Sequence, residues 1–321
     1  MKFNQYTWNL YKQTAIGIEM IKYFSDAGGY ALFRDYCPHA NFIPADLYND
    51  WLENIYCYGV SDYDYPTSLE EAKDLYISLI TLGVRVGRQQ WLPANDFKNM
   101  LGVIQPISYV LSQFAPEYFF PYLFLCRIFE LNKIADFFNM NLPNIPKRTD
   151  YKGRCMYYWD LCEVFYLFRK ENGLSPAELW SFLYDFAPNN LPSEKIDIPK
   201  PSQVWFIGGR LYQEDKSLES KFWQSSPETK KGDILIHYET SPISAITCIE
   251  TSLTDGVIDP LFRYYGCIHI GNRMNIPHIT LKELQTDEYF SKHPLVKKNF
   301  QGVNGCSVNG EDYSELIQIG R

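Results

Sequence analysis

The chain lacks a long uninterrupted apolar run, a signal core and an excess of basic residues. Its longest apolar run, residues 118–131, is broken by Arg127 and Glu130 and is too short to span a bilayer. The net charge is −8, and a split at Pro199 leaves 17 basic and 23 acidic residues before it, then 13 and 15 after it. These features disfavour membrane binding and a broad phosphate-binding surface. We expect a cytoplasmic protein.

Cysteine pairs and known catalytic motifs are also missing. The eight cysteines include no C-x-x-C pair, which favours reduced core thiols. Cys37 and His39 have no second cluster at zinc-site spacing, so a turn with a buried thiol is the favoured interpretation. No phosphate-binding loop, nucleophile elbow or zinc-protease motif occurs. We therefore expect neither metal nor cofactor, and no catalytic residue is identified, although this leaves the question of enzyme activity open.

What is present is the composition of a globular protein with many aromatic residues. Apolar residues make up 46% of the 321 positions, charged residues 21% and aromatic residues 17%. That length is enough for two domains with separate cores. Aromatic side chains fill cores and also serve as stacking surfaces, so their number alone does not distinguish the two uses.

Residues 1–195 have the pattern of an all-helical domain. Ser68 followed by Glu71 predicts a capping box, after which apolar residues repeat at helical spacing as far as Val86. A second helix is predicted over 120–138, and a third ends at Gly173. Ser175 predicts the start of another, which we expect to end at Pro188.

The polar, proline-containing segment 189–203 is typical of a linker. Short β-branched and aromatic runs follow it at 204–209, 233–239, 243–251 and 263–271. Thr280 with Glu283 predicts a further capping box, and another short helix is expected near the C-terminus. Trp223 lies where a charged, helix-like stretch meets a polar turn. His237 and His269, each within an apolar strand, are interpreted as satisfied sheet histidines.

The order of features in residues 200–321 resembles the PUA superfamily and, within it, the EVE and YTH-like branch. The segments that carry the resemblance are Trp223-Gln224-Ser225, Gly232-Asp233, Tyr238, Ile246 and Asn299-Phe300-Gln301-Gly302. The W-x-x-K opening and the basic R-N-x-x-A-R-N stretch of the EVE pattern are missing. The resemblance implies an α+β chain, in which an N-terminal all-helical domain (1–195) precedes a small PUA-like β-barrel domain with short helices (200–321).

The resemblance also implies a ligand. Domains of this branch read modified bases, which insert between aromatic walls and show their polar edge to the protein. Trp223 is the expected wall, although burial in the core is an equal alternative. For Trp205 a core role is the favoured interpretation, and for Phe300 a core role is open. The base-binding candidates are Trp223, Gln224, Ser225, Tyr238, Asn299, Phe300, Gln301, Asn304 and Trp205.

Three functions remain open at this point. The first is a reader of modified bases in DNA or RNA, fused to a helical domain that acts as an effector or docks a partner protein or a second copy. Such fusions resemble subunits of prokaryotic anti-phage or modification-dependent restriction systems. The second is an enzyme acting on a modified base, such as a DNA glycosylase. The third is a protein-interaction scaffold whose pocket is empty.

Overall fold

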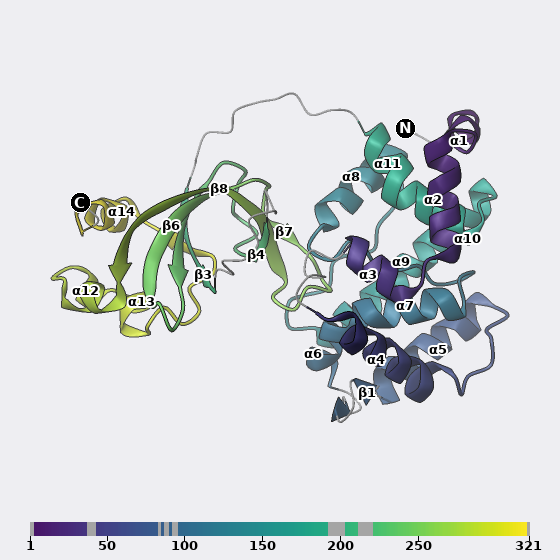
Figure 1. Ribbon diagram of the computed structural model, residues 1–321, viewed down its shortest axis with the longest axis horizontal. Coiled ribbons are helices and arrows are strands. Elements are labelled where there is room, and N and C mark those ends of the chain that lie inside the picture. Colours follow the sequence, from purple (N-terminus) through teal and green to yellow (C-terminus); the bar gives the residue numbers. More distant parts are fainter. Residues whose placement is uncertain are drawn as a thin grey trace. The chain divides into compact units, whose positions relative to one another are not determined.

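The computed structural model describes residues 3–36, 43–82, 85–86, 90–91, 96–191, 203–210 and 221–319. It divides the chain into two compact units (Figure 1). Unit 1 comprises Met1–Glu194 together with Asp259–Arg263, and unit 2 comprises Lys195–Ile258 and Tyr264–Arg321. The expected order, a helical part followed by a strand-rich part, is confirmed. Cys37, His39 and most of the expected linker lie outside the described residues.

Unit 1 is built from helices, with one short hairpin among its described residues. Its core is rich in aromatic side chains, including the fully buried Trp159 and Tyr76. No helix in the described ranges has both the length and the apolar character needed to cross a membrane. The elements are α1 (Gln5–Tyr11), α2 (Ala15–Asp26), α3 (Gly29–Tyr36), α4 (Ala45–Ile55), α5 (Leu69–Leu82), β1 (Arg85–Val86), β2 (Gln90–Trp91), α6 (Phe97–Met100), α7 (Ile104–Phe114), α8 (Ile128–Phe138), α9 (Tyr151–Asn172), α10 (Pro176–Ser181) and α11 (Ala187–Asn190).

Several helix ends follow the sequence signals. Ser175 and Glu178 form a complete capping box at the start of α10, and Gly173, whose φ of 62° is left-handed, caps the C-terminal end of α9. At α5 only half of the expected box forms. The Glu71 N–H donates to Ser68 Oγ, but the Glu71 carboxylate accepts from the backbone N–H and hydroxyl of Thr67 instead.

Three helix predictions were wrong. Residues 118–127 are largely buried but not helical, and α8 begins only at Ile128, because apolar spacing does not distinguish a buried loop from a helix. Leu82 is 63% exposed at the end of α5, and Val86 belongs to β1. Pro188 does not end a helix. α10, a π-helical turn over Phe182–Phe186 and α11 follow one another without a break, and Pro188 lies within this helical run.

The segment Asp259–Arg263 belongs to unit 1 although it lies far along the strand-rich half of the sequence. The buried Arg154 guanidinium donates to the carbonyl oxygens of Pro260 at 2.8 Å and Phe262 at 2.7 Å. The buried Asp259 carboxylate accepts from the backbone N–H of Cys126 at 2.8 Å. Unit 1 is therefore assembled from two separate stretches of the chain.

Unit 2 contains one curled sheet of seven strands among its described residues (Figure 1). The order along the sheet is β4-β8-β6-β5-β3-β9, with β7 paired to β8. β3 and β5 are parallel, whereas the other pairs are antiparallel. The strands are β3 (Val204–Gly209), β4 (Lys221–Gln224), β5 (Ile234–Glu239), β6 (Ala245–Ser252), β7 (Val257–Ile258), β8 (Gly266–Thr280) and β9 (Cys306–Val308), and the helices are α12 (Leu281–Thr286), α13 (Pro294–Lys297) and α14 (Gly310–Ile319).

The two faces of this sheet carry different side chains because neighbours on a strand alternate in direction. On one, which we call the helix-covered face, Phe206, Ile236 and Tyr238 pack with Leu284 of α12 and Leu316 of α14. The other, which we call the Trp223 face, carries a smaller apolar cluster that Trp223 contacts. That cluster consists of Trp205, Ile207, Leu235, Ile268 and Ile270.

The four strand segments expected from sequence each contain a strand, and the capping box of Thr280 and Glu283 is complete at α12. The expected helix before Trp223 was wrong for the described residues, since Lys221–Gln224 is strand β4, paired antiparallel with β8. The charged residues before position 221 suggested a solvated helix. The aromatic pair Phe222 and Trp223, which suits a strand, was the better signal.

Candidate functional site

Trp223 is a partly buried side chain on β4. Its indole lies directly over Gly209, where a Cβ atom would collide with the six-membered ring. Glycine at this position therefore lets the aromatic ring approach the backbone of β3 closely. The ring also meets His237 edge to face, with ring centroids 4.8 Å apart and an interplanar angle of 63°.

Asn304 fixes the orientation of the indole. Its Oδ1 accepts from the Trp223 Nε1–H at 3.1 Å and from the Gly208 backbone N–H at 2.8 Å. Its Nδ2 donates to the Gly208 carbonyl oxygen at 3.0 Å. The amide of Asn304 thus pairs with both polar groups of one β3 residue, as a neighbouring strand would, and this leaves Oδ1 directed at the indole.

Beside Trp223 lies a hydrogen-bonded chain of three residues from three strands. Glu250 Oε2 is 2.9 Å from His237 Nδ1, and its Oε1 accepts from Arg273 Nε at 2.9 Å and Nη2 at 2.8 Å. The side chains of His237 and Glu250 are 0% and 2% exposed, whereas that of Arg273 is 32% exposed. His237 Nε2 is buried and has no hydrogen-bond partner among the residues that the structure describes.

The charges in this chain favour an ionised Glu250. Burial alone raises the pKa of a carboxyl group, but the hydrogen bond with His237 and the adjacent Arg273 guanidinium outweigh it and lower the Glu250 pKa below its usual value. The group is therefore a carboxylate whose two oxygens are both occupied, one by each neighbour.

Cys248 stands directly opposite His237 on β6, and donor atoms of His237, Cys248 and Glu250 lie within 4.8 Å of one another. These are metal-ligand residue types. However, burial raises the pKa of the Cys248 thiol to about 11, which keeps it protonated and a poor ligand or nucleophile near neutral pH. The Arg273 guanidinium also occupies the position beside Glu250 that a cation would take. The arrangement fits hydrogen bonding better than metal binding or thiol chemistry.

The structure brings only some of the sequence-predicted residues together. Trp223 and Asn304 are joined by a hydrogen bond, and Trp205 lies in the cluster that Trp223 contacts. Trp205 is itself core, 3% exposed, with its Nε1–H donating to Asp233 Oδ2 at 2.9 Å. Asp233, whose carboxylate also accepts two backbone N–H groups, explains the need for aspartate in the Gly-Asp turn.

Tyr238 and Phe300 lie on the helix-covered face. Their rings stack on each other at 4.2 Å with an interplanar angle of 8°, and they are 3% and 4% exposed. Tyr238 follows His237 on β5, so alternation places the two side chains on opposite faces. Phe300 is thus the core residue that the sequence left open, and the Tyr238 ring is occupied by it.

The remaining candidates are spread around unit 2. Gln224 is partly buried beside Trp223 on β4, and Ser225 is buried with its hydroxyl 3.0 Å from that of Thr229. Asn299 and Gln301 are exposed, and Asn299 Oδ1 accepts from Gln285 Nε2 at 3.0 Å. Neither residue belongs to the apolar cluster of the Trp223 face.

Sequence reasoning missed the polar chain beside Trp223. It interpreted His237 as a satisfied sheet histidine, which is correct for Nδ1 but not for Nε2. Glu250 and Arg273 were not singled out. The available signal was a histidine and a glutamate inside two neighbouring apolar segments that were expected to be strands, since a buried charge in a strand requires a partner.

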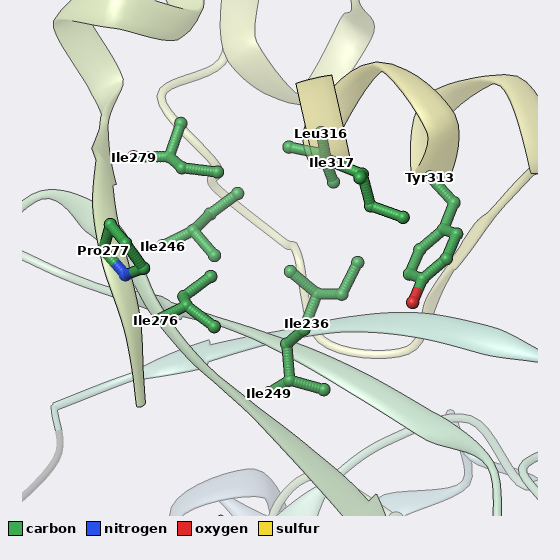
Figure 2. Close-up of a pocket in the computed structure, with 9 residues that line it drawn as sticks. All are labelled: Ile236, Ile246, Ile249, Ile276, Pro277, Ile279, Tyr313, Leu316 and Ile317. Carbon is green, nitrogen blue, oxygen red and sulfur yellow. The ribbon is translucent and has the colours of Figure 1, made fainter. Parts of the chain in front are cut away.

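The helix-covered face contains a separate cavity of about 210 Å³ beneath α14 (Figure 2). Tyr313 supplies the only polar side-chain group in its lining. Such a cavity suits an apolar group, whereas a base needs polar partners for its edge. None of the base-binding candidates lines it. The lining residues are Ile236, Ile246, Ile249, Ile276, Pro277, Ile279, Tyr313, Leu316 and Ile317.

Comparisons with known proteins give no family for this chain. Neither a protein-family model nor a curated protein matches it. The NMR structure of Rpa0253 from Rhodopseudomonas palustris is similar over 37% of this chain and 92% of its own, with 15% identity and a TM-score of 0.32. At that TM-score the match indicates neither function nor ligand.

Proposed function

We propose that unit 2 binds a nucleobase that has left its stack, with Trp223 as the stacking surface. Aromatic side chains contribute about 1–3 kcal/mol per stacked base, and this term needs no basic surface. The negative net charge of the chain fits such a mode, in which the base rather than the phosphates supplies most of the affinity.

The observation that carries the proposal is a partly exposed indole held rigidly beside an unpartnered hydrogen-bonding atom. Asn304 and Gly209 hold the Trp223 ring, and His237 Nε2 lies in the adjacent imidazole. Recognition of an unstacked base requires these two elements, a ring surface and a polar partner for the base edge. Tyr238 and Phe300 are not part of this proposed site, because each ring already stacks on the other.

We further propose that the ligand is a modified base in DNA or RNA, as the resemblance to EVE and YTH-like domains implies. A methyl group placed in a dry pocket adds roughly 0.8 kcal/mol by burial. Modification therefore refines affinity, while stacking and edge hydrogen bonds supply most of it.

The test compares variants of two tryptophans in titrations with labelled single-stranded DNA and RNA that carry one methylated adenine, one methylated cytosine or no modification. Trp223→Ala should weaken binding of the preferred oligonucleotide by about ten- to a hundred-fold, the equivalent of about 1–3 kcal/mol. Trp223→Phe keeps a smaller ring and should retain part of the affinity.

Trp205→Phe is the matched control, since it also removes an indole N–H that donates to a side-chain oxygen. We expect it to lower the melting temperature while binding stays near that of the parent. A stable Trp223→Ala protein that binds as tightly as the parent, or a parent that binds none of the oligonucleotides, would overturn the proposed function.

A further inference from the structure

The hydrogen bonds around Glu250 determine which nitrogen of His237 carries the proton. An ionised carboxylate can only accept, so the hydrogen between Glu250 Oε2 and His237 Nδ1, 2.9 Å apart, belongs to Nδ1. Arg273 already balances the charge of Glu250 through two N–H donors. A neutral imidazole therefore leaves the buried group without excess charge.

In this tautomer His237 Nε2 is a hydrogen-bond acceptor. It is buried and has no partner within the described part of the chain, next to the indole of Trp223. Buried polar atoms are nearly always hydrogen-bonded, and an unpaired one is costly enough to require an explanation. A ligand N–H group directed at Nε2 would supply the missing donor.

We propose that His237 Nε2 determines ligand specificity, by accepting a hydrogen bond from the exocyclic amine of an adenine- or cytosine-type base stacked at Trp223. A base with a carbonyl group in that place puts two acceptors face to face and is rejected. The inference rests on the proposed function. Glu250 and Arg273 act through His237 as positioning residues, because they hold the tautomer that makes Nε2 an acceptor.

Glu250→Gln tests this arrangement sharply. The two N–H groups of Arg273 require an oxygen at the position of Oε1, so the new amide must turn its NH₂ group toward His237. That group then donates to Nδ1, which moves the imidazole proton to Nε2. The atom that faces the ligand changes from an acceptor to a donor, and the preference for amine over carbonyl should reverse.

The experiment has two readouts on the full chain. ¹⁵N chemical shifts of the His237 ring, assigned by their loss in His237→Phe, should report a proton on Nδ1 in the parent and on Nε2 in Glu250→Gln. Binding is compared for oligonucleotides that differ only in 5-methylcytosine or thymine, and for a second pair with adenine or hypoxanthine. The parent should prefer the amine-bearing member of each pair by about ten- to a hundred-fold, and Glu250→Gln should lose or reverse that preference.

The outcomes separate this inference from the proposed function. Trp223-dependent binding with equal affinity for both members of each pair would overturn the role of His237 alone. The same conclusion follows if Glu250→Gln keeps the parent's selectivity after its proton has moved to Nε2, or if the parent carries its proton on Nε2. Absence of binding by every oligonucleotide overturns both.

Discussion

Two buried carboxylates, one in each unit, show how the choice of partners determines charge. Glu250 in unit 2 is bound by His237 and Arg273, and its pKa is lowered. Asp259 in unit 1 accepts from the backbone N–H groups of Cys126, Leu261 and Phe262 and from the Tyr122 hydroxyl, and its pKa is raised to about 6.

The difference does not come from the number of hydrogen bonds, because Asp259 accepts four and Glu250 three in the described residues. Burial is the largest influence on both pKa values and raises each. Neutral donors only partly offset it at Asp259, whereas a guanidinium and an imidazole outweigh it at Glu250. An opposite charge, more than a full set of hydrogen bonds, keeps a buried carboxyl ionised.

The largest expected effect is on the pH dependence of unit 1. Asp259 has a folded pKa of about 6 against an ordinary value of 3.8, so the folded state binds its proton more tightly. The stability that this group contributes is complete below about pH 4 and is lost as pH rises through about 6, a change of about 3 kcal/mol. We expect the free energy of unfolding of the parent, minus that of Asp259→Asn, to fall by about this amount as pH rises through that range. Urea unfolding, followed by the circular dichroism of the helices, measures it.

Glu250→Ala provides the opposite case. Its pKa is lowered in the folded state, so the group stabilises the fold at pH values above its ordinary pKa of 4.5. This stability is lost as pH falls through the folded-state pKa. The free energy of unfolding of the parent, minus that of Glu250→Ala, should therefore rise with pH in the acid range. Hydrogen exchange of the amides in β5 and β6 measures it. If both differences changed with the same sign, the contrast between the two carboxylates would be wrong.

A smaller effect is expected when either member of the Glu250–Arg273 pair is removed. Arg273→Met leaves a carboxylate buried without its main counter-charge and should cost unit 2 about 2–3 kcal/mol, below the range for fully buried pairs because the guanidinium is a third exposed. Glu250→Ala leaves a guanidinium that can turn toward water, but it also leaves the buried His237 Nδ1–H without its acceptor and should cost about 1–3 kcal/mol. Urea unfolding near pH 7 measures both, and an unchanged stability of either variant would contradict the assigned pairing.

The smallest expected effect concerns one neutral donor. The Tyr122 hydroxyl lies 3.3 Å from Asp259 Oδ1, a long hydrogen bond. Tyr122→Phe should destabilise unit 1 by about 0.5–1 kcal/mol and move the pH dependence of Asp259 slightly further upward. The same pH series of urea unfolding detects this, and an effect as large as that of Asp259→Asn would show that neutral donors matter more than inferred.

The sequence predicted the local features of this fold better than the long-range ones. The capping boxes at Ser175 and Thr280 depend on residues three apart, and both form. The apolar run before Ile128 was misassigned, because its burial depends on packing that spacing does not encode. Trp223 was expected at the end of a helix-like stretch, whereas it lies on strand β4.

The candidate site was only partly predictable for the same reason. Trp223 and Asn304 were singled out, but their hydrogen bond joins residues 81 positions apart. His237 and Glu250 meet only because β5 and β6 pair in one register, and a shift of one residue would point Glu250 to the other face. Tyr238 lies on the helix-covered face for the same reason, since His237, its neighbour on β5, occupies the Trp223 face.

The return of the chain to unit 1 at Asp259–Arg263 has a consequence for synthesis. When residues 1–195 have left the ribosome, the Arg154 guanidinium and the Cys126 N–H still lack the acceptors that positions 259, 260 and 262 supply. In a nascent chain these donors therefore have no native acceptor until another sixty or so residues have been synthesised. At translation rates of about 5–20 residues per second this takes roughly 3–13 seconds. The helical part is the first to be made, yet it is completed only after most of the sheet has emerged.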